Sequence, residues 1–205
     1  MIVVAFGCNL GSSEREKILR FCAARESLIA AGCRLAGQSA LFLTPPLGSG
    51  HQPAYLNAIA VFDRGPPPAM LLRLLKRIER IHGRRFGRHW GPRVLDLDLI
   101  LHGSRVTGWP VHRRHRGALS VPHPELHRRA FVLLPMLDAE RSIGRAFWHP
   151  VFGQSIRTLA QRLPNASRGI KRLDGPSPWT APLSKKTSQN GRHPLGLTQL
   201  TSASA

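Results

Sequence analysis

Asp96 and Asp98 are the residues whose type and spacing best suit chemistry, and they lie in the stretch 90–101, WGPRVLDLDLIL. Carboxylates and apolar residues alternate there with a period of two, which indicates a β-strand. Residues two apart on a strand point to the same face, about 6–7 Å from one another. Two carboxylates held side by side repel each other unless positive charge lies between them, and Mg²⁺ often binds through one or two carboxylates plus substrate phosphates. The pattern therefore predicts a divalent metal site.

A cluster of arginines precedes these carboxylates: Arg84, Arg85, Arg88 and Arg93. Guanidinium groups match phosphate oxygens, so paired acids beside them favour a site for a metal–polyphosphate. A half-solvated antiparallel strand shows the same alternation of Asp and Leu, and the tripeptide alone does not decide between the two. The arginines and the flanking Trp-Gly-Pro-Arg favour the site.

Length and composition predict one folded domain with a tail. The chain has 205 residues, 42% of them hydrophobic, which is enough for a sizeable core. Its apolar runs are much shorter than the ~18 residues that span a bilayer, and residues 1–7 are typical of a first strand rather than a signal peptide. The three cysteines, Cys8, Cys22 and Cys33, have no metal-ligand spacing. We expect a monomer in the reducing cytoplasm, without a membrane partner.

The net charge of +19 arises from 30 Lys and Arg against 11 Asp and Glu, and it implies anionic partners. A basic nucleic-acid-binding module without catalysis is the competing class of protein. Against it stand the low aromatic content of 6%, the lack of a DNA- or RNA-binding signature, and the paired aspartates, which repel a phosphate backbone. We therefore expect no specific nucleic-acid partner.

The elements that must position the aspartates follow from periodicity. Strands are predicted over 2–6, 33–43, 55–62 and the aspartate segment, and helices over 13–31, 66–83, a short stretch ending at 137, and 154–163. The order β-α-β-β-α-β with alternating strands indicates an α+β, ferredoxin-like fold with a mainly antiparallel sheet. Residues 165–205 lose apolar periodicity, which predicts a basic, disordered tail beyond a domain at 1–164. We expect removal of everything after Leu163 to leave fold and activity intact.

Several separate segments resemble the 6-hydroxymethyl-7,8-dihydropterin pyrophosphokinase family of folate biosynthesis. The matching motifs are Gly7–Gly11 (GCNLG), Thr44–Gly48 (TPPLG), Gln52–Ala58 (QPAYLNA), Arg77–Glu79, Gly83-Arg84, Trp90–Asp98, Val121–Pro124 (VPHP) and Arg129–Phe131, in the family's order across about residues 1–163. The resemblance implies a ferredoxin-like α/β/α sandwich that transfers pyrophosphate from ATP to the pterin hydroxymethyl group and releases AMP. It also implies two Mg²⁺ ions held by Asp96 and Asp98.

The resemblance assigns further roles residue by residue. Arg84 and Arg93 join Asp96 and Asp98 as catalytic residues. The pterin would be bound by Thr44, Pro45, Leu47, Tyr55, Asn57 and Phe131. ATP would be bound by Glu79, Trp90, Arg93, Ile100, His123 and Arg129.

Some positions depart from the family's pattern. Cys8 replaces a serine, His89 stands where an arginine usually precedes the tryptophan, and Phe86 falls where a second loop arginine is common. The register of residues 83–90 leaves Arg85 and Arg88 as alternatives to Arg84. Because this loop is the family's lid, these departures leave open a pyrophosphokinase that has lost turnover. Nothing in the sequence explains the unusually basic segment 111–117.

Overall fold

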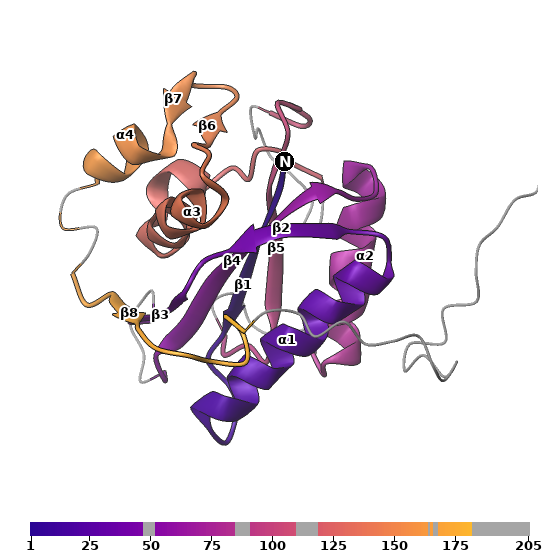
Figure 1. Ribbon diagram of the computed structural model, residues 1–205, viewed down its shortest axis with the longest axis vertical. Helices are drawn as coiled ribbons and strands as arrows, with labels where there is room; N and C mark the ends of the chain where they lie inside the picture. The colour runs from indigo at the N-terminus through magenta and orange to yellow at the C-terminus, as the bar shows by residue number, and fades with distance from the viewer. Residues whose placement is uncertain (47–51, 85–90, 110–118, 164, 166–167, 182–205) are drawn as a thin grey trace, which may run out of the picture.

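The computed structural model describes residues 1–46, 52–84, 91–109, 119–163, 165 and 168–181. One mainly antiparallel sheet lies between two layers of helices (Figure 1). The helices α1 (Glu14–Ala30) and α2 (Pro68–Ile81) cover one face, and α3 (Ala130–Ile143) and α4 (Ile156–Gln161) lie on the other side. This confirms the predicted α+β sandwich. Within the described ranges, no helix has both the length and the apolar character needed to cross a bilayer.

The sheet has the strand order β5-β1-β4-β3-β8, and β2 also pairs with β4. Its members are β1 (Ile2–Cys8), β2 (Arg34–Gln38), β3 (Leu41–Thr44), β4 (Tyr55–Arg64), β5 (Asp96–His102) and β8 (Lys171–Leu173). A separate pair is formed by β6 (Trp148–His149) and β7 (Gln154–Ser155), and a 3-10 turn covers Leu126–Arg128. The central register sets Gly7 of β1 opposite Asn57 of β4 on one side and opposite Asp96 of β5 on the other.

Local signals account for most element boundaries. Ser13 caps α1, because its side chain accepts a 3.1 Å hydrogen bond from the Glu16 amide. The strand predicted over 33–43 is two strands, since the Ser39 amide bonds to the Ile59 carbonyl and the Ala40 amide bonds to Asp138 at the turn between them. The helix predicted to end at 137 continues to Ile143 and stops at Gly144, whose φ of 63° suits glycine.

Two apolar cores lie on the two faces of the sheet. Leu95, Leu97 and Leu99 are at most 4% exposed and pack toward α1 and α2, as their spacing predicts. Ile100 and Leu101 are also buried, in the core that includes α3. The alternation ends there because β1 and β5 shift register at Val3/Val4 and helices cover both faces.

The prediction of disorder after residue 164 is wrong for residues 168–181, the C-terminal segment. Lys171–Leu173 forms β8 and pairs with β3, and Trp179 is fully buried in the core beneath α1. The described residues beyond 164 thus belong to the same domain, and the predicted boundary does not separate them. Apolar periodicity does not reveal this segment, because Trp179 is the one buried side chain among residues 168–181. A single buried residue produces no repeating pattern in the sequence.

A buried histidine is expected to make stability depend on pH. His149 is 0% exposed, its Nδ1 accepts 3.3 Å bonds from the Val151 and Phe152 amides, and its ring stacks on Phe152. Burial, helped by the nearby His127, lowers the pKa of His149 from 6.5 to about 4. The fold therefore favours the neutral ring. The stabilisation is complete above pH 6.5 and is lost as pH falls toward 4.

Chemical denaturation at several pH values checks this expectation. Between pH 7 and pH 5, this histidine should lower the free energy of unfolding by about 2 kcal/mol. His149→Asn carries no titratable ring, so its stability should fall less over the same interval. Equal pH dependence of the two proteins would contradict the assignment.

Candidate active site

The candidate site lies at one end of the sheet, on the face that α3 covers farther along. Asp96 and Asp98 share this face with Ile100 because the strand period is two, and Ile100 belongs to the core beside α3. Gly7 lies between Asn57 and Asp96 in the register. A Cβ added at Gly7 would approach Asn57 Oδ1 to 3.3 Å, so a side chain there would crowd the floor of the site.

Asp96 is held between two guanidinium groups. Its Oδ1 accepts a hydrogen bond from Arg84 Nη1 at 2.5 Å and another from Arg93 Nη1 at 2.8 Å. Burial alone would lower the pKa of Arg84, but the nearby carboxylates outweigh it and raise that pKa above its usual value. The arrangement brings together three of the four predicted catalytic residues.

Asp98 faces Lys76 and His123 at longer range. Its Oδ1 lies 3.8 Å from Lys76 Nζ, and its Oδ2 lies 4.0 Å from His123 Nε2, distances too long for hydrogen bonds. Burial raises the pKa of Asp98, but the electrostatic effect of His123, Lys76 and the neighbouring arginines is larger and lowers it overall. The carboxylate is therefore charged at neutral pH, with oxygens that can still accept another cation.

Glu79 is a buried carboxylate that contacts three groups around the aspartates. It is 2% exposed, and its Oε1 accepts bonds from Lys76 Nζ and from the Leu97 amide, each 2.8 Å long. The same oxygen forms an ion pair with Arg84. Burial raises the pKa of Glu79, and these donors oppose that effect. Glu79 thus fixes α2, β5 and Arg84 relative to one another.

Lys76 and Asn9 belong to the site although the sequence did not single them out. Lys76 also donates a 3.1 Å bond to the Leu97 carbonyl. In the sequence, Lys76 is notable only because it lies three residues before Glu79 on α2, a spacing that is typical of a solvent-exposed ion pair.

Asn9 joins the segment before β5 to the end of β1. Its side-chain Oδ1 accepts a 2.7 Å hydrogen bond from the Arg93 backbone amide, and its backbone amide donates a 3.0 Å hydrogen bond to the Arg93 carbonyl. Its Nδ2 donates to Gln52 Oε1 at 3.1 Å. Asn9 is 1% exposed, and a buried Asn within the GCNLG motif was the available signal.

Polar groups for a flat heterocycle lie beside these charges. Asn57 Nδ2 donates a 2.8 Å bond to Thr44 Oγ1, and both residues are buried. The Tyr55 hydroxyl lies 3.4 Å from the Gly91 carbonyl, and burial raises the pKa of Tyr55. Pro45 follows β3 and is exposed. The predicted pterin residues of β3 and β4 are therefore adjacent.

The start of α3 and the turn before it supply the remaining groups. The Arg129 guanidinium lies 5.7 Å from the centre of the Phe131 ring. The His123 amide bonds to the Ile100 carbonyl at 2.9 Å, and His123 Nδ1 accepts from the Glu125 amide at 3.2 Å. Burial lowers the pKa of His123 more than Asp98 raises it, so the ring is neutral at pH 7. Ile100 is 1% exposed, which leaves its side chain no surface for ATP.

Comparisons with known proteins identify the family. The model of the 7,8-dihydro-6-hydroxymethylpterin-pyrophosphokinase (HPPK) family matches residues 3–141. The chain belongs to the HPPK family. It is 39% identical to the 2-amino-4-hydroxy-6-hydroxymethyldihydropteridine pyrophosphokinase of Pseudomonas aeruginosa over 137 residues, 67% of this chain and 78% of that protein. It is 34% identical to the pyrophosphokinase of Mycobacterium bovis over 199 residues, 95% of each chain.

Solved structures agree on the fold. The crystal structure of Plasmodium falciparum HPPK-DHPS superposes with a TM-score of 0.57 at 14% identity, over 83% of this chain. This chain spans 46% of the length of that protein. The likeness shows that the two chains share a fold over the matched residues.

Several predicted site and loop residues fall outside the described residues. Leu47, Trp90, Phe86 and His89 lie there, as do the alternatives Arg85 and Arg88. Of Arg84, Arg85 and Arg88, Arg84 is described, and it contacts Asp96 directly. The basic segment 111–117 also lies outside the described ranges.

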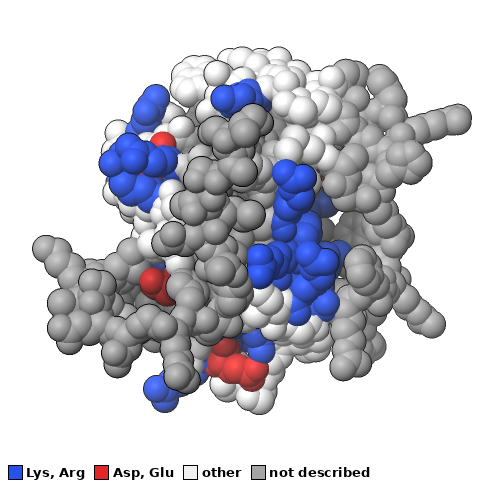
Figure 2. Space-filling view, turned by 90° about the vertical axis from the view of Figure 1, so that its right-hand side faces the viewer, with Lys and Arg blue, Asp and Glu red and all other residues white. Residues whose placement is uncertain are grey.

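Basic side chains also line the outer side of α2. Figure 2 shows a column of Lys and Arg on the side of the molecule formed by α2. The exposed arginines of α2 are Arg73, Arg77 and Arg80, while its one acid, Glu79, points inward. This surface has a positive potential, which favours anionic partners.

The carboxylates suit a metal that arrives with its substrate. In the ranges that the structure covers, no three His, Cys, Asp or Glu residues form a metal-binding group. Asp96 and Asp98 are nevertheless partly exposed, on one face, and each lies close to a cation, Arg84 and Lys76 respectively. Mg²⁺ keeps several waters and binds through one or two carboxylates plus phosphates, so two aspartates fit it without a third protein ligand.

Proposed function

We propose that this chain transfers pyrophosphate from ATP to the hydroxymethyl group of 6-hydroxymethyl-7,8-dihydropterin, releasing AMP, in folate synthesis. One observation supports this most directly: the charged cluster at Asp96 and the polar pair Asn57–Thr44 are separated only by Gly7. A nucleotide and a neutral heterocycle bound on these two sides would meet at that glycine. Membership of the HPPK family gives the reaction its class.

The pterin side offers an amide and two aromatic rings. A pterin presents donors and acceptors along one edge, and Asn57 with Thr44 can match that edge. Tyr55 and Phe131 carry the apolar faces that a flat ring requires. Leu47 and Pro45 complete the proposed pocket.

The ATP side offers cations of two kinds. Arg93 and Arg84 can exchange Asp96 for phosphate oxygens, because a guanidinium binds either anion through the same planar fork. Arg129 and His123 lie toward the start of α3 and can donate to phosphates from that side. Trp90 and Ile100 remain proposed ATP contacts, the latter through its backbone.

Asp96 and Asp98 are the proposed ligands of two Mg²⁺ ions. Bound there, Mg²⁺ would neutralise phosphate charge and stabilise the oxygens on either side of the transferred phosphorus. In the reaction the pterin hydroxyl oxygen bonds to the β-phosphorus, the bond from that phosphorus to the α–β bridging oxygen breaks, and the hydroxyl proton is lost. The chain's own residues hold the two substrates in line and balance the charge that develops.

A coupled assay of AMP formation tests the proposal. We expect AMP only when Mg²⁺, ATP and the hydroxymethyldihydropterin are all present. A protein that binds both substrates but releases no AMP would support the alternative that turnover has been lost. A protein that binds neither would contradict the proposal.

Asn57→Ala separates the pterin side from the ATP side. Removing the amide should weaken pterin binding by about 10-fold or more, because a buried hydrogen bond to a ligand is worth about 1–3 kcal/mol. Affinity for MgATP should change little. Calorimetric titration with each substrate measures both, and equal losses for the two would show a folding defect instead.

We also propose a cytoplasmic, monomeric protein. Cys8, Cys22 and Cys33 are free thiols, and burial raises the pKa of each, so they are unreactive residues that suit a reducing compartment.

A further inference from the structure

Trp179 anchors the C-terminal segment, residues 168–181, between α1 and the sheet. Its ring lies 5.1 Å from Phe6 of β1 and 5.8 Å from Phe21 of α1, measured between ring centres. Its Nε1 donates a 2.9 Å bond to the Ser39 carbonyl. Trp179 is 0% exposed, so the segment is fixed at this end by a side chain that fills the core.

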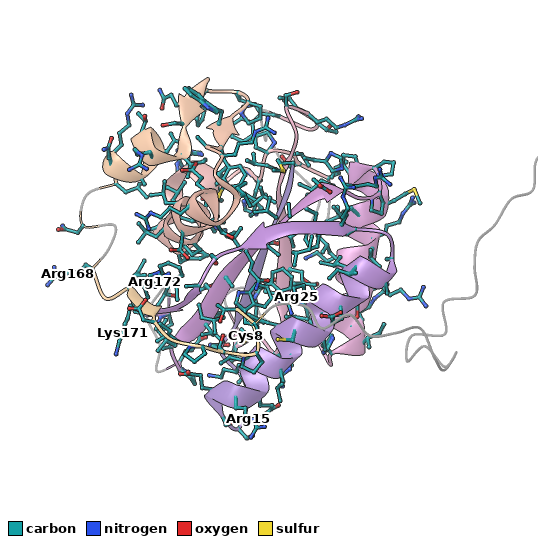
Figure 3. The ribbon with its side chains drawn as sticks, viewed as in Figure 1. Cys8, Arg15, Arg25, Arg168, Lys171 and Arg172 are labelled. Carbon is teal, nitrogen blue, oxygen red and sulfur yellow. The ribbon has the colours of Figure 1, made fainter. Side chains whose placement is uncertain are left out.

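Arg25 closes the other side of this anchor. Its guanidinium lies 5.0 Å from the centre of the Trp179 ring, and its Nη1 donates a 2.7 Å bond to the Trp179 carbonyl. Gln38 donates to the same carbonyl. Figure 3 labels Arg25 on α1 and Lys171 and Arg172 on β8, and the ribbon of the segment runs between them.

The other half of the segment extends the sheet along β3. Leu41, Phe42 and Leu43 pair with Leu173, Arg172 and Lys171. Without β8, the four residues of β3 would form an edge strand held by β4 alone. Next to this pairing, Gly169 lies against Pro45, where an added Cβ would come within 3.3 Å of Pro45 Cγ.

These contacts converge on the strand that carries the pterin side of the site. Thr44 ends β3 and accepts the bond from Asn57, and Pro45 follows it. Arg172 Nε also donates a 3.0 Å bond to Asp138, whose other oxygen accepts the Ala40 amide at 2.6 Å, at the start of β3. Both ends of β3 are therefore fixed through the segment or its partners.

The residues of the proposed ATP side lie far from the C-terminal segment in the sheet. Asp96 and Asp98 lie on β5, the edge of the sheet opposite β8. Their neighbours Lys76, Glu79 and Arg84 belong to α2 and the residues just after it. A displacement of the C-terminal segment would reach β3 before it reached β5.

We propose that the C-terminal segment is a positioning element for the pterin subsite, anchored by Trp179 and acting on Thr44 and Pro45 through β8 and Gly169. The inference rests on the proposed function. It assigns no catalytic step to the segment, which touches neither the carboxylates nor the arginines of the site. It does predict that changes in the segment alter pterin affinity and leave ATP affinity unchanged.

Two glycines of the segment provide a matched pair of variants in the full chain. Gly169 has a φ of +75° and Gly175 a φ of +107°, so alanine strains the backbone at both. The Cβ of Gly169→Ala presses on Pro45, whereas that of Gly175→Ala meets no described atom within 4 Å. The pair separates a push on Pro45 from the general cost of strain.

Steady-state kinetics with each substrate varied in turn tests the proposal. Gly169→Ala should raise the KM for the pterin by about 3- to 10-fold, since small misplacements in a site are costly, and should leave the KM for ATP within about two-fold. Gly175→Ala should change neither KM. Similar changes in both constants, or the same pterin effect from both variants, would overturn the proposal.

A second variant keeps the test decisive if Gly169→Ala does not fold. Trp179→Phe keeps a ring in the slot but removes the Nε1 donor to Ser39, and it should raise the KM for the pterin selectively. An unchanged KM for the pterin would refute the inference. Equilibrium titration with the pterin and with MgATP needs no turnover, so selective loss of pterin binding would support the inference even if the proposed reaction failed.

Discussion

Asp98→Asn is expected to lower the turnover number by at least about 10²-fold, because the change removes both a metal ligand and its charge. Asp96→Asn should have an effect of the same order. The two carboxylates are partly exposed and face one side of β5, whereas the neighbouring acid Glu79 is buried and cannot take the place of either. The measured quantity is the rate of AMP release at saturating ATP and pterin.

The two aspartates should differ in their effect on the free protein. Asp96 accepts hydrogen bonds from Arg84 and Arg93, whereas Asp98 lies 3.8 Å from Lys76 and 4.0 Å from His123, beyond hydrogen-bond distance of either. Asp96→Asn should therefore change the melting temperature more than Asp98→Asn, while both lose turnover. Raising the Mg²⁺ concentration should recover part of the lost rate if ligation is what failed.

Asp63→Asn is the matched control for these variants. Asp63 forms an ion pair with the exposed Arg34 at the end of β4, away from the site, so its loss should leave turnover unchanged. Turnover near the wild-type value in Asp96→Asn or Asp98→Asn would remove the metal assignment. A comparable loss of turnover in Asp63→Asn would show that removing any carboxylate charge slows the enzyme, so that the effect would not be specific to metal ligands.

Trp179→Ala is expected to lower the free energy of unfolding by about 3–5 kcal/mol, the usual cost of emptying a large aromatic site in a core. The side chain is fully buried, contacts Phe6 and Phe21, and donates to the Ser39 carbonyl, which the change would leave without this partner. For a domain of this size the melting temperature should fall by about 6–20 °C. Denaturant titration and calorimetry measure both quantities.

Trp148→Ala is the matched control, because Trp148 is 60% exposed and its removal should cost less than about 1 kcal/mol. The comparison decides between two views of the chain after Leu163. The sequence predicted that this part is dispensable, and the structure places one of the largest core side chains in it. Equal stability of the two tryptophan variants would favour the first view.

The sequence alone determined the parts of the site that depend on local spacing. The period of two from Leu95 to Leu99 put both aspartates on one face, because side-chain direction along a strand follows from backbone geometry without reference to the rest of the fold. The helical period of α2 is equally local. Motif order then indicated the HPPK family, which the comparisons confirm.

Only the tertiary structure decided which distant residues complete these local patterns. Trp179 and Ser39 are 140 positions apart, and no periodicity links them, so the order of residues 168–181 emerges only when α1 and β3 are in place. The sequence indicates that Lys76 is a solvated cation, and only the packing of α2 against β5 shows that its Nζ lies 3.8 Å from Asp98 Oδ1. Asn9 gains its role when Arg93 folds back onto β1. Local periodicity constrains neighbours in sequence, whereas these contacts depend on packing between elements whose pairing the sequence pattern does not encode.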